Sequence, residues 1–206
     1  LKYHNDRPKQ LTEPYLFVPC QVKTGSQTLL RSTWIRTMFD LVEQLVNIKK
    51  QLGADIPQLV FKTHPACPQD YSELRQTLAA MEIDACFVED VLTADLVAHS
   101  EAVITINSTT GLEALLAGKR VITLGLAYYN IDGLVLHADN SDALKVALCK
   151  LHQWQPDEQL RQRFLHHLLD EHVIDTHWKK ADQHHLELLT QRLRQLTSRS
   201  TERSQP

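Results

Sequence analysis

The sequence A-V-I-T-I-N-S-T-T-G-L-E-A-L-L-A-G-K-R-V-I-T-L-G occupies residues 102–125 and sets the architecture of the chain. Its apolar runs at 102–106 and 120–124 predict two buried strands. Between them we expect a polar turn at 107–111 and a short helix at 112–117. Two buried strands joined by a crossover helix are typical of a parallel sheet.

The same alternation of short apolar runs and amphipathic stretches continues on both sides of this segment. Further strands are predicted at 15–19, 58–62, 85–88 and 134–136, and further helices at 33–52, 71–81, 93–100 and 141–154. Apolar positions in the helices recur at intervals of three and four residues. The pattern predicts an α/β fold, namely a Rossmann-like parallel sheet with helices on both faces.

The ends of the chain differ from this central part. Residues 1–14 are polar and contain two prolines, so we expect a lead-in or linker before a Rossmann-like domain at 15–155. Residues 156–196 are predicted to form helices without strands, and residues 197–206 are predicted to be a disordered tail. Because the sequence starts at Leu1 rather than Met, we expect it to be a piece of a longer protein.

Composition narrows the functional classes. The net charge of -3 argues against a broad nucleic-acid-binding surface. The sequence shows neither a signal peptide nor an apolar run of the roughly 20 residues that a membrane span requires. The cysteines form no C-x-x-C pair and the C-terminal histidines no H-x-x-x-H pair, so we expect no metal site and predict free thiols in a reducing cytosol.

The strongest candidate binding element is the hydroxyl-rich turn after the strand at 102–106. Ser108, Thr109, Thr110 and Gly111 stand where a strand ends and a helix begins. The unpaired N–H groups of a first helical turn and the helix dipole attract anions. One hydroxyl would suffice to cap the helix, so three hydroxyls and a glycine favour a phosphate-binding turn.

Glu113 lies one helical turn after Thr109 and has two interpretations. It could accept hydrogen bonds from ribose hydroxyl groups of a ligand. It could equally form a capping box with Thr110, three residues earlier. The sequence leaves both open.

Two further segments follow predicted strands and should therefore reach the same edge of the sheet. Lys62, Thr63, His64 and Pro65 place a cation and an imidazole there, and the proline restrains the residue before it.

The other segment is a polar loop after the first strand, with Gln21, Ser26 and Gln27 as candidate substrate-binding residues, although it could equally be a plain connecting loop. After the strand at 120–124, Tyr128 could stack on a base or a sugar, or it could cover the core.

These segments resemble the bacterial capsular polysaccharide biosynthesis family that includes the Kdo transferases. The likeness extends from about Phe17 to Trp178. It rests on F-V-P-C-Q-V with S-Q following, then K-T-H-P, then I-N-S-T-T-G-L-E-A-L-L-A-G-K, in this order.

The resemblance implies the nucleotide-binding lobe of a two-lobed GT-B glycosyltransferase. His64 and Pro65 match the element that contacts the CMP part of the donor, and Ser108 and Thr109 match the hydroxyl pair at its phosphate. A CMP-activated Kdo-like sugar would be the donor and a lipid-linked glycan the acceptor, without cofactor or metal. Such an enzyme would be cytoplasmic and could associate peripherally with the inner membrane or with other capsule-assembly proteins.

One position departs from the family pattern. The family commonly has an acidic residue in the loop after Gln21, where this sequence has Gly25. Glycine has no side chain that could act as a nucleophile or general base. A non-catalytic nucleotide-binding or scaffold domain therefore stays open as an alternative. A UDP-sugar enzyme of the same fold is another alternative, because it would share the phosphate site at the helix N-terminus.

Overall fold

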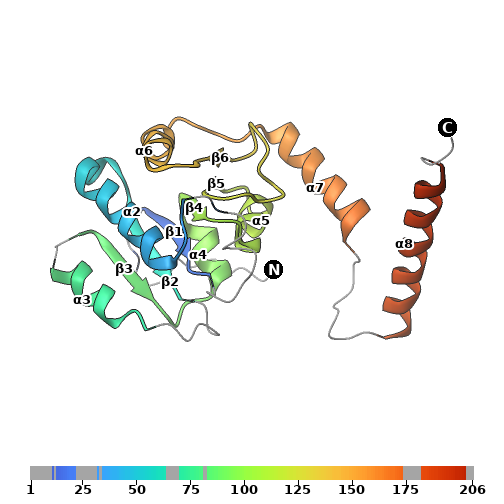
Figure 1. Ribbon diagram of the computed structural model, residues 1–206, viewed down its shortest axis with the longest axis horizontal. Helices are drawn as coiled ribbons and strands as arrows, with labels where there is room; N and C mark the ends of the chain where they lie inside the picture. Colours follow the sequence, from blue (N-terminus) through green and yellow to red (C-terminus); the bar gives the residue numbers. More distant parts are fainter. Residues whose placement is uncertain are drawn as a thin grey trace. The chain divides into compact units, whose positions relative to one another are not determined.

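The computed structural model describes residues 11, 13–21, 32, 34–63, 70–80, 83–173 and 182–202, with side chains described as far as residue 194. Six parallel strands form one sheet in the order β3-β2-β1-β4-β5-β6 (Figure 1). The strands are β1 (Tyr15–Pro19), β2 (Gln58–Lys62), β3 (Ala85–Val88), β4 (Ala102–Thr105), β5 (Arg120–Thr123) and β6 (Leu136–His137). The strand order reverses between β1 and β4, and ligands in open α/β sheets bind at such a reversal.

Helices connect the strands and continue after them. They are α2 (Met38–Leu52), α3 (Ser72–Ala80), α4 (Thr93–His99), α5 (Thr109–Leu116), α6 (Ser141–Lys150), α7 (Glu158–His172) and α8 (Gln183–Glu202), with a 3-10 helix η1 at Gly53–Asp55. The predicted Rossmann-like α/β fold is therefore confirmed.

Alternate residues of each strand point to opposite faces of the sheet. On one face, the even-numbered residues of β1 and β4 pack into a core that contains the apolar side chains of α2, α3 and α6. The intervening residues are also fully buried, among them Phe17, Val103 and Val121. They face the side of α4, where the Tyr15 hydroxyl donates to the Leu96 carbonyl at 2.9 Å. Burial on both faces explains why the strands read as continuous apolar runs.

Four element boundaries differ from the predicted ones by two residues or more, one of them the end of helix α6, which lies at Lys150 rather than near residue 154. Helix α2 begins at Met38 rather than near residue 33, because the Thr37 and Asp40 side chains form a capping box there. Helix α5 begins at Thr109 rather than 112, because Ser108 caps it. Strand β6 covers Leu136–His137, later than the predicted 134–136.

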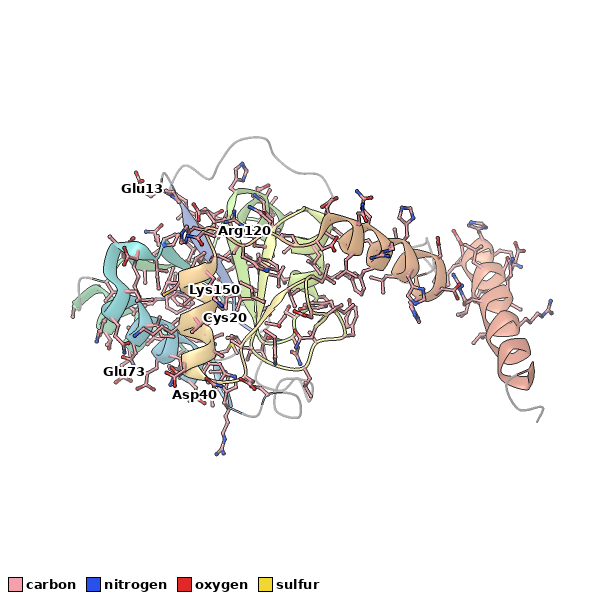
Figure 2. The ribbon with its side chains drawn as sticks, turned by 90° about the horizontal axis from the view of Figure 1, so that it is seen from above. Glu13, Cys20, Asp40, Glu73, Arg120 and Lys150 are labelled. Atoms are coloured by element: carbon pink, nitrogen blue, oxygen red, sulfur yellow. The ribbon has the colours of Figure 1, made fainter. Side chains whose placement is uncertain are left out.

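The two ends of the strands form distinct edges of the molecule. Figure 2 shows Glu13 and Arg120, which lie at the starts of strands, at one edge, and Asp40 and Glu73, near the starts of helices α2 and α3, at the other. The second edge is the carboxyl edge of the sheet, where all predicted binding segments should lie. The described part of the chain therefore presents helix N-termini and strand C-termini together.

The chain divides into two compact units, residues 1–161 and 162–206. The first unit extends beyond residue 155, where we predicted the end of the domain. The first turn of α7 belongs to this unit. There the Arg161 guanidinium donates to the Leu115 carbonyl at 2.7 Å and pairs with Glu158 at 2.6 Å.

The second unit contains most of α7 and all of α8. Helix α8 continues to Glu202, so part of the segment that we predicted to be disordered, 197–206, is helical. No glycine or proline interrupts the sequence from residue 183 to 205, so no helix-breaking residue prevents the extension.

A buried lysine at the opposite edge of the sheet provides a test of this packing. Lys49 is only 6% exposed, and its ammonium group donates to the Ile56 carbonyl and lies 3.6 Å from the Asp84 carboxylate. We expect Lys49→Ala to lower the free energy of unfolding by about 1.5–3 kcal/mol, because hydrogen bonds to a charged group are lost.

Urea unfolding followed by circular dichroism measures this change. The neighbouring exposed residue supplies the control, since Lys50→Ala should stay within about 0.5 kcal/mol of the unchanged chain. Equal stability of the two variants would contradict a structural role of the Lys49 ammonium group.

Candidate binding site at the carboxyl edge

The start of α5 is built by hydrogen bonds of Ser108. The Ser108 N–H donates to the Thr105 hydroxyl at 3.1 Å, and the Ser108 hydroxyl accepts from the Thr110 N–H at 3.2 Å. These bonds turn the chain from β4 into the helix. Ser108 is therefore the helix cap, and the simple capping interpretation applies to this hydroxyl.

The neighbouring hydroxyl groups have different surroundings. Thr110 is half-buried, and its hydroxyl accepts a hydrogen bond from the Ser108 hydroxyl at 3.2 Å. Thr109 is the first residue of the helix and is exposed. Its side chain is therefore the hydroxyl in this turn that a ligand could reach most directly.

The side chain of Tyr129 requires glycine at position 111. A Cβ atom at this position would lie 2.3 Å from the Tyr129 hydroxyl oxygen and 2.7 Å from the adjoining ring carbon. Tyr129 is fully buried and donates from its hydroxyl to the Ser108 carbonyl. The sequence predicted Gly111 as part of a phosphate-binding turn, and in the structure its missing side chain makes room for Tyr129. The buried environment raises the pKa of the Tyr129 hydroxyl, so this donor keeps its proton.

Gln21 connects the two strands at which the strand order reverses. Its side-chain Nε2 donates to Asn107 Oδ1 at 3.0 Å, which joins the end of β1 to the end of β4. The other side-chain atom, Oε1, is buried and has no hydrogen-bond partner among the described residues. Buried polar atoms are almost always paired, so this acceptor calls for a donor from a neighbouring segment or a ligand.

Glu113 does not form the capping box that we considered. The cap of α5 is Ser108, so the third helical residue is Gly111, and Thr110 lies inside the helix rather than at its cap. The carboxylate of Glu113 is half-buried, and desolvation raises its pKa. The interpretation in which Glu113 accepts hydrogen bonds from a ligand stays a prediction.

Lys62 lies at the end of β2, but its ammonium group is directed to the chain that follows β3. It donates to the carbonyls of Glu89 and Val91 at 2.7 and 2.5 Å. Burial lowers the pKa of the Lys62 amine, and the acidic neighbours Asp90 and Glu89 oppose this shift. Two of its three N–H donors thus hold the loop, and one is left for another acceptor.

Tyr128 lies in the loop between β5 and β6. It is 54% exposed, and its ring packs edge-on against Tyr129 with centroids 5.1 Å apart. Its exposure favours the stacking interpretation over the one in which it covers the core.

Four other predicted site residues lie outside the described residues. They are Ser26, Gln27, His64 and Pro65.

The sequence interpretation missed a polar cluster beside this site. Thr123 at the end of β5 is fully buried and donates to Asn130 Oδ1, while Asn130 Nδ2 donates to His137 Nδ1 at 2.8 Å. The sequence offered one signal for this cluster, namely a threonine at the end of one strand and a histidine at the end of the next. The partner on the intervening loop, Asn130, could not be paired with them from spacing alone.

The described part of the chain lacks two other kinds of feature. No group of three or more histidine, cysteine, aspartate or glutamate side chains there could hold a metal ion. Among the same residues, no helix has the length and apolar character needed to span a membrane.

The contact between Gly111 and Tyr129 predicts that replacing the glycine by alanine changes the stability in the direction opposite to the usual one. In a helix, Gly→Ala ordinarily stabilises by about 0.5–1 kcal/mol. Here the added methyl group would collide with Tyr129, so we expect Gly111→Ala to destabilise the chain by about 1–3 kcal/mol.

Urea unfolding of the single variants and of the double variant Gly111→Ala/Tyr129→Leu measures this interaction. The glycine substitution should cost less when Tyr129 is already replaced, because the two residues are in contact. An increase in stability of the single Gly111→Ala variant would contradict the observed packing.

The raised pKa of Glu113 predicts a pH dependence of stability. The folded state binds a proton at Glu113 more tightly than the unfolded state, whose pKa is near the ordinary value of 4.5. The resulting stabilisation is present below that value and is lost as the pH rises through the folded-state pKa.

Glu113→Gln cannot titrate, so unfolding free energies should be compared between pH 4 and pH 7. The unchanged chain should lose stability relative to the variant as the pH rises. A constant difference between the two chains would show that the carboxyl group has an ordinary pKa.

Comparison with known proteins extends these observations. Residues 2–177 match the family described as capsule polysaccharide biosynthesis protein. Protein FixF of Sinorhizobium fredii is 35% identical over 167 residues, which cover 81% of this chain and 40% of that protein. The capsule polysaccharide export protein KpsS of Escherichia coli is 36% identical over 171 residues, which cover 78% of this chain and 41% of that protein.

A solved structure supports the same fold. The beta Kdo 2,7 transferase KpsC of Thermosulfurimonas dismutans aligns with a TM-score of 0.50 and 22% identity, over 69% of this chain and 47% of that chain. The chain spans about two fifths of the length of the two sequence relatives. The chain therefore belongs to the capsule polysaccharide biosynthesis family and has a GT-B glycosyltransferase-like fold.

Proposed function

We propose that this chain is the donor-binding lobe of a glycosyltransferase in capsular polysaccharide synthesis. The donor is a CMP-activated, acidic, Kdo-like sugar, and the acceptor is a lipid-linked glycan. The observation that carries the proposal is the capped start of α5 beside the Gln21–Asn107 bridge, where the strand order reverses. Family membership and a fold shared with a Kdo transferase support the same class of reaction.

The start of α5 suits a phosphate. Its partial positive charge and the exposed Thr109 hydroxyl offer donors to phosphate oxygens. Ser108 contributes by holding the turn, since its hydroxyl already accepts from the Thr110 N–H. In transfer, the bond between the sugar and the phosphate breaks, and negative charge develops on the departing CMP. Donors at the phosphate stabilise that charge in the transition state.

Other residues would surround the phosphate. We propose that His64 and Pro65 contact the CMP part of the donor, with Lys62 contributing its remaining N–H. The buried Gln21 Oε1 would accept from a donor group of the ligand or of the adjoining loop, which carries Ser26 and Gln27.

The rest of the donor would extend over other elements of the same edge. Tyr128 would stack on the base or sugar, and Glu113 would accept from ribose hydroxyl groups. The reaction would need no metal, and it would take place at the cytoplasmic face of the inner membrane, where a lipid-linked acceptor is available.

A second candidate function rests on one residue. The family resemblance implies an acidic residue in the segment after Gln21, and this sequence has Gly25 there, which supplies no carboxylate. A chain that binds the nucleotide without transferring sugar would act as a scaffold in capsule assembly.

Separate measurements of binding and transfer distinguish these functions. We expect isothermal titration calorimetry to show CMP binding that is stronger than UMP or UDP binding. Transfer requires the full-length protein, a CMP-activated Kdo donor and a lipid-linked acceptor. CMP binding with no transfer would support the scaffold, and preference for UDP would contradict the proposed donor.

Single substitutions locate the nucleotide site. His64→Ala and Thr109→Ala should each weaken CMP binding roughly 10- to 100-fold, because each removes a hydrogen bond to an anion worth about 1.5–3 kcal/mol. Ser141→Ala is a matched control, since Ser141 is an exposed hydroxyl residue in the first turn of another helix, α6.

The control variant should bind CMP as the unchanged chain does, and all variants should keep their unfolding transitions. Unchanged binding by both His64→Ala and Thr109→Ala would place the nucleotide elsewhere.

A further inference from the structure

His137 lies on the same face and edge of the sheet as the start of α5. It pairs in register with Thr123 of β5, which in turn pairs with Thr105 of β4. Residues in register point to the same face, and Thr105 accepts the Ser108 N–H on this face. Two strand spacings, about 10 Å, separate His137 from Thr105. A nucleotide held by its phosphate at α5 can extend over that distance.

The side-chain amide of Asn130 fixes the protonation pattern of the His137 ring. Asn130 Oδ1 accepts from the buried Thr123 hydroxyl, while Nδ2 donates to the Gly125 carbonyl at 3.3 Å and to His137 Nδ1 at 2.8 Å. Both N–H groups and the carbonyl oxygen of the amide are thus in use. The Gly125 carbonyl can only accept, so it requires Nδ2 on its side, and the opposite amide orientation would set two oxygen atoms against each other there. His137 Nδ1 must therefore be an acceptor, so the neutral ring carries its proton on Nε2.

The loop that fixes His137 is also fixed to α5. Tyr129, next to Asn130 in sequence, donates to the Ser108 carbonyl at the helix cap. Adjacent residues of one loop therefore hold the candidate phosphate turn and the imidazole in a defined relation. His137 itself is exposed, so its Nε2–H is available to a ligand.

We propose that His137 is a ligand-binding residue whose Nε2–H donates to an oxygen atom of the bound nucleotide. The inference rests on the proposed function, because it takes the nucleotide to be held at the start of α5. Asn130 and Thr123 act through His137 and are positioning residues: they set which ring nitrogen carries the proton.

The tautomer is tested first, without any ligand. Long-range ¹H–¹⁵N spectra of imidazole-labelled protein, recorded at a pH where His137 is neutral, should show the proton on Nε2. In Asn130→Ala only the Thr123 hydroxyl, 3.1 Å from Nδ1, remains at this nitrogen. A hydroxyl can donate or accept, so a mixture of the two tautomers should appear. A free chain whose His137 carries its proton on Nδ1 would overturn the proposal.

Binding is tested next, with CMP as the probe. His137→Ala should weaken CMP binding roughly tenfold, the loss expected for one hydrogen bond. His137→Gln, whose side-chain N–H₂ can occupy the place of Nε2–H, should restore most of the affinity. His152→Ala is the control, because His152 is also an exposed histidine and follows α6 near the opposite edge. It should bind CMP as the unchanged chain does.

The outcomes separate the two proposals. If the unchanged chain binds CMP and His137→Ala binds it equally well, the role of His137 is wrong and the proposed function stands. If the unchanged chain binds no CMP, the proposed function fails and this inference fails with it.

Discussion

The contact of Tyr129 with the start of α5 is the constraint on which the carboxyl edge depends. The hydroxyl of this buried residue donates to the Ser108 carbonyl, and its ring occupies the space beside Gly111. One side chain thus joins the loop between β5 and β6 to the turn after β4. Because Asn130 follows directly, the same loop also positions His137. The loop between β5 and β6 therefore positions the residues of the carboxyl edge as much as the sheet does.

The sequence predicted the strands well, because a parallel sheet covered on both faces needs continuous apolar residues. Strands β1 to β5 were expected within one residue of their observed bounds. The starts of α2 and α5 were less accurate, since apolar periodicity does not reveal which polar residue becomes the cap. Ser108 and Thr37 were both available, and side-chain hydrogen bonds selected them.

The candidate site was predictable in position but not in its detailed contacts. The carboxyl ends of parallel strands lie at one edge, which brings Gln21 to Asn107 across 86 positions of sequence. The particular roles could not be predicted, because each depends on a distant partner. Lys62 binds carbonyls after β3, and Gly111 accommodates Tyr129. The residues adjacent in sequence do not reveal such long-range contacts.

Arg161 has a consequence for the electrostatics of α5. Its guanidinium group lies at the Leu115 carbonyl, at the carboxyl end of the helix, where a cation offsets the negative pole of the peptide dipoles. The first turn of α5 contains no acidic residue, whereas Asp40 neutralises the corresponding turn of α2. One pole of α5 is therefore compensated within the chain, and the positive pole is left to attract an external negative charge.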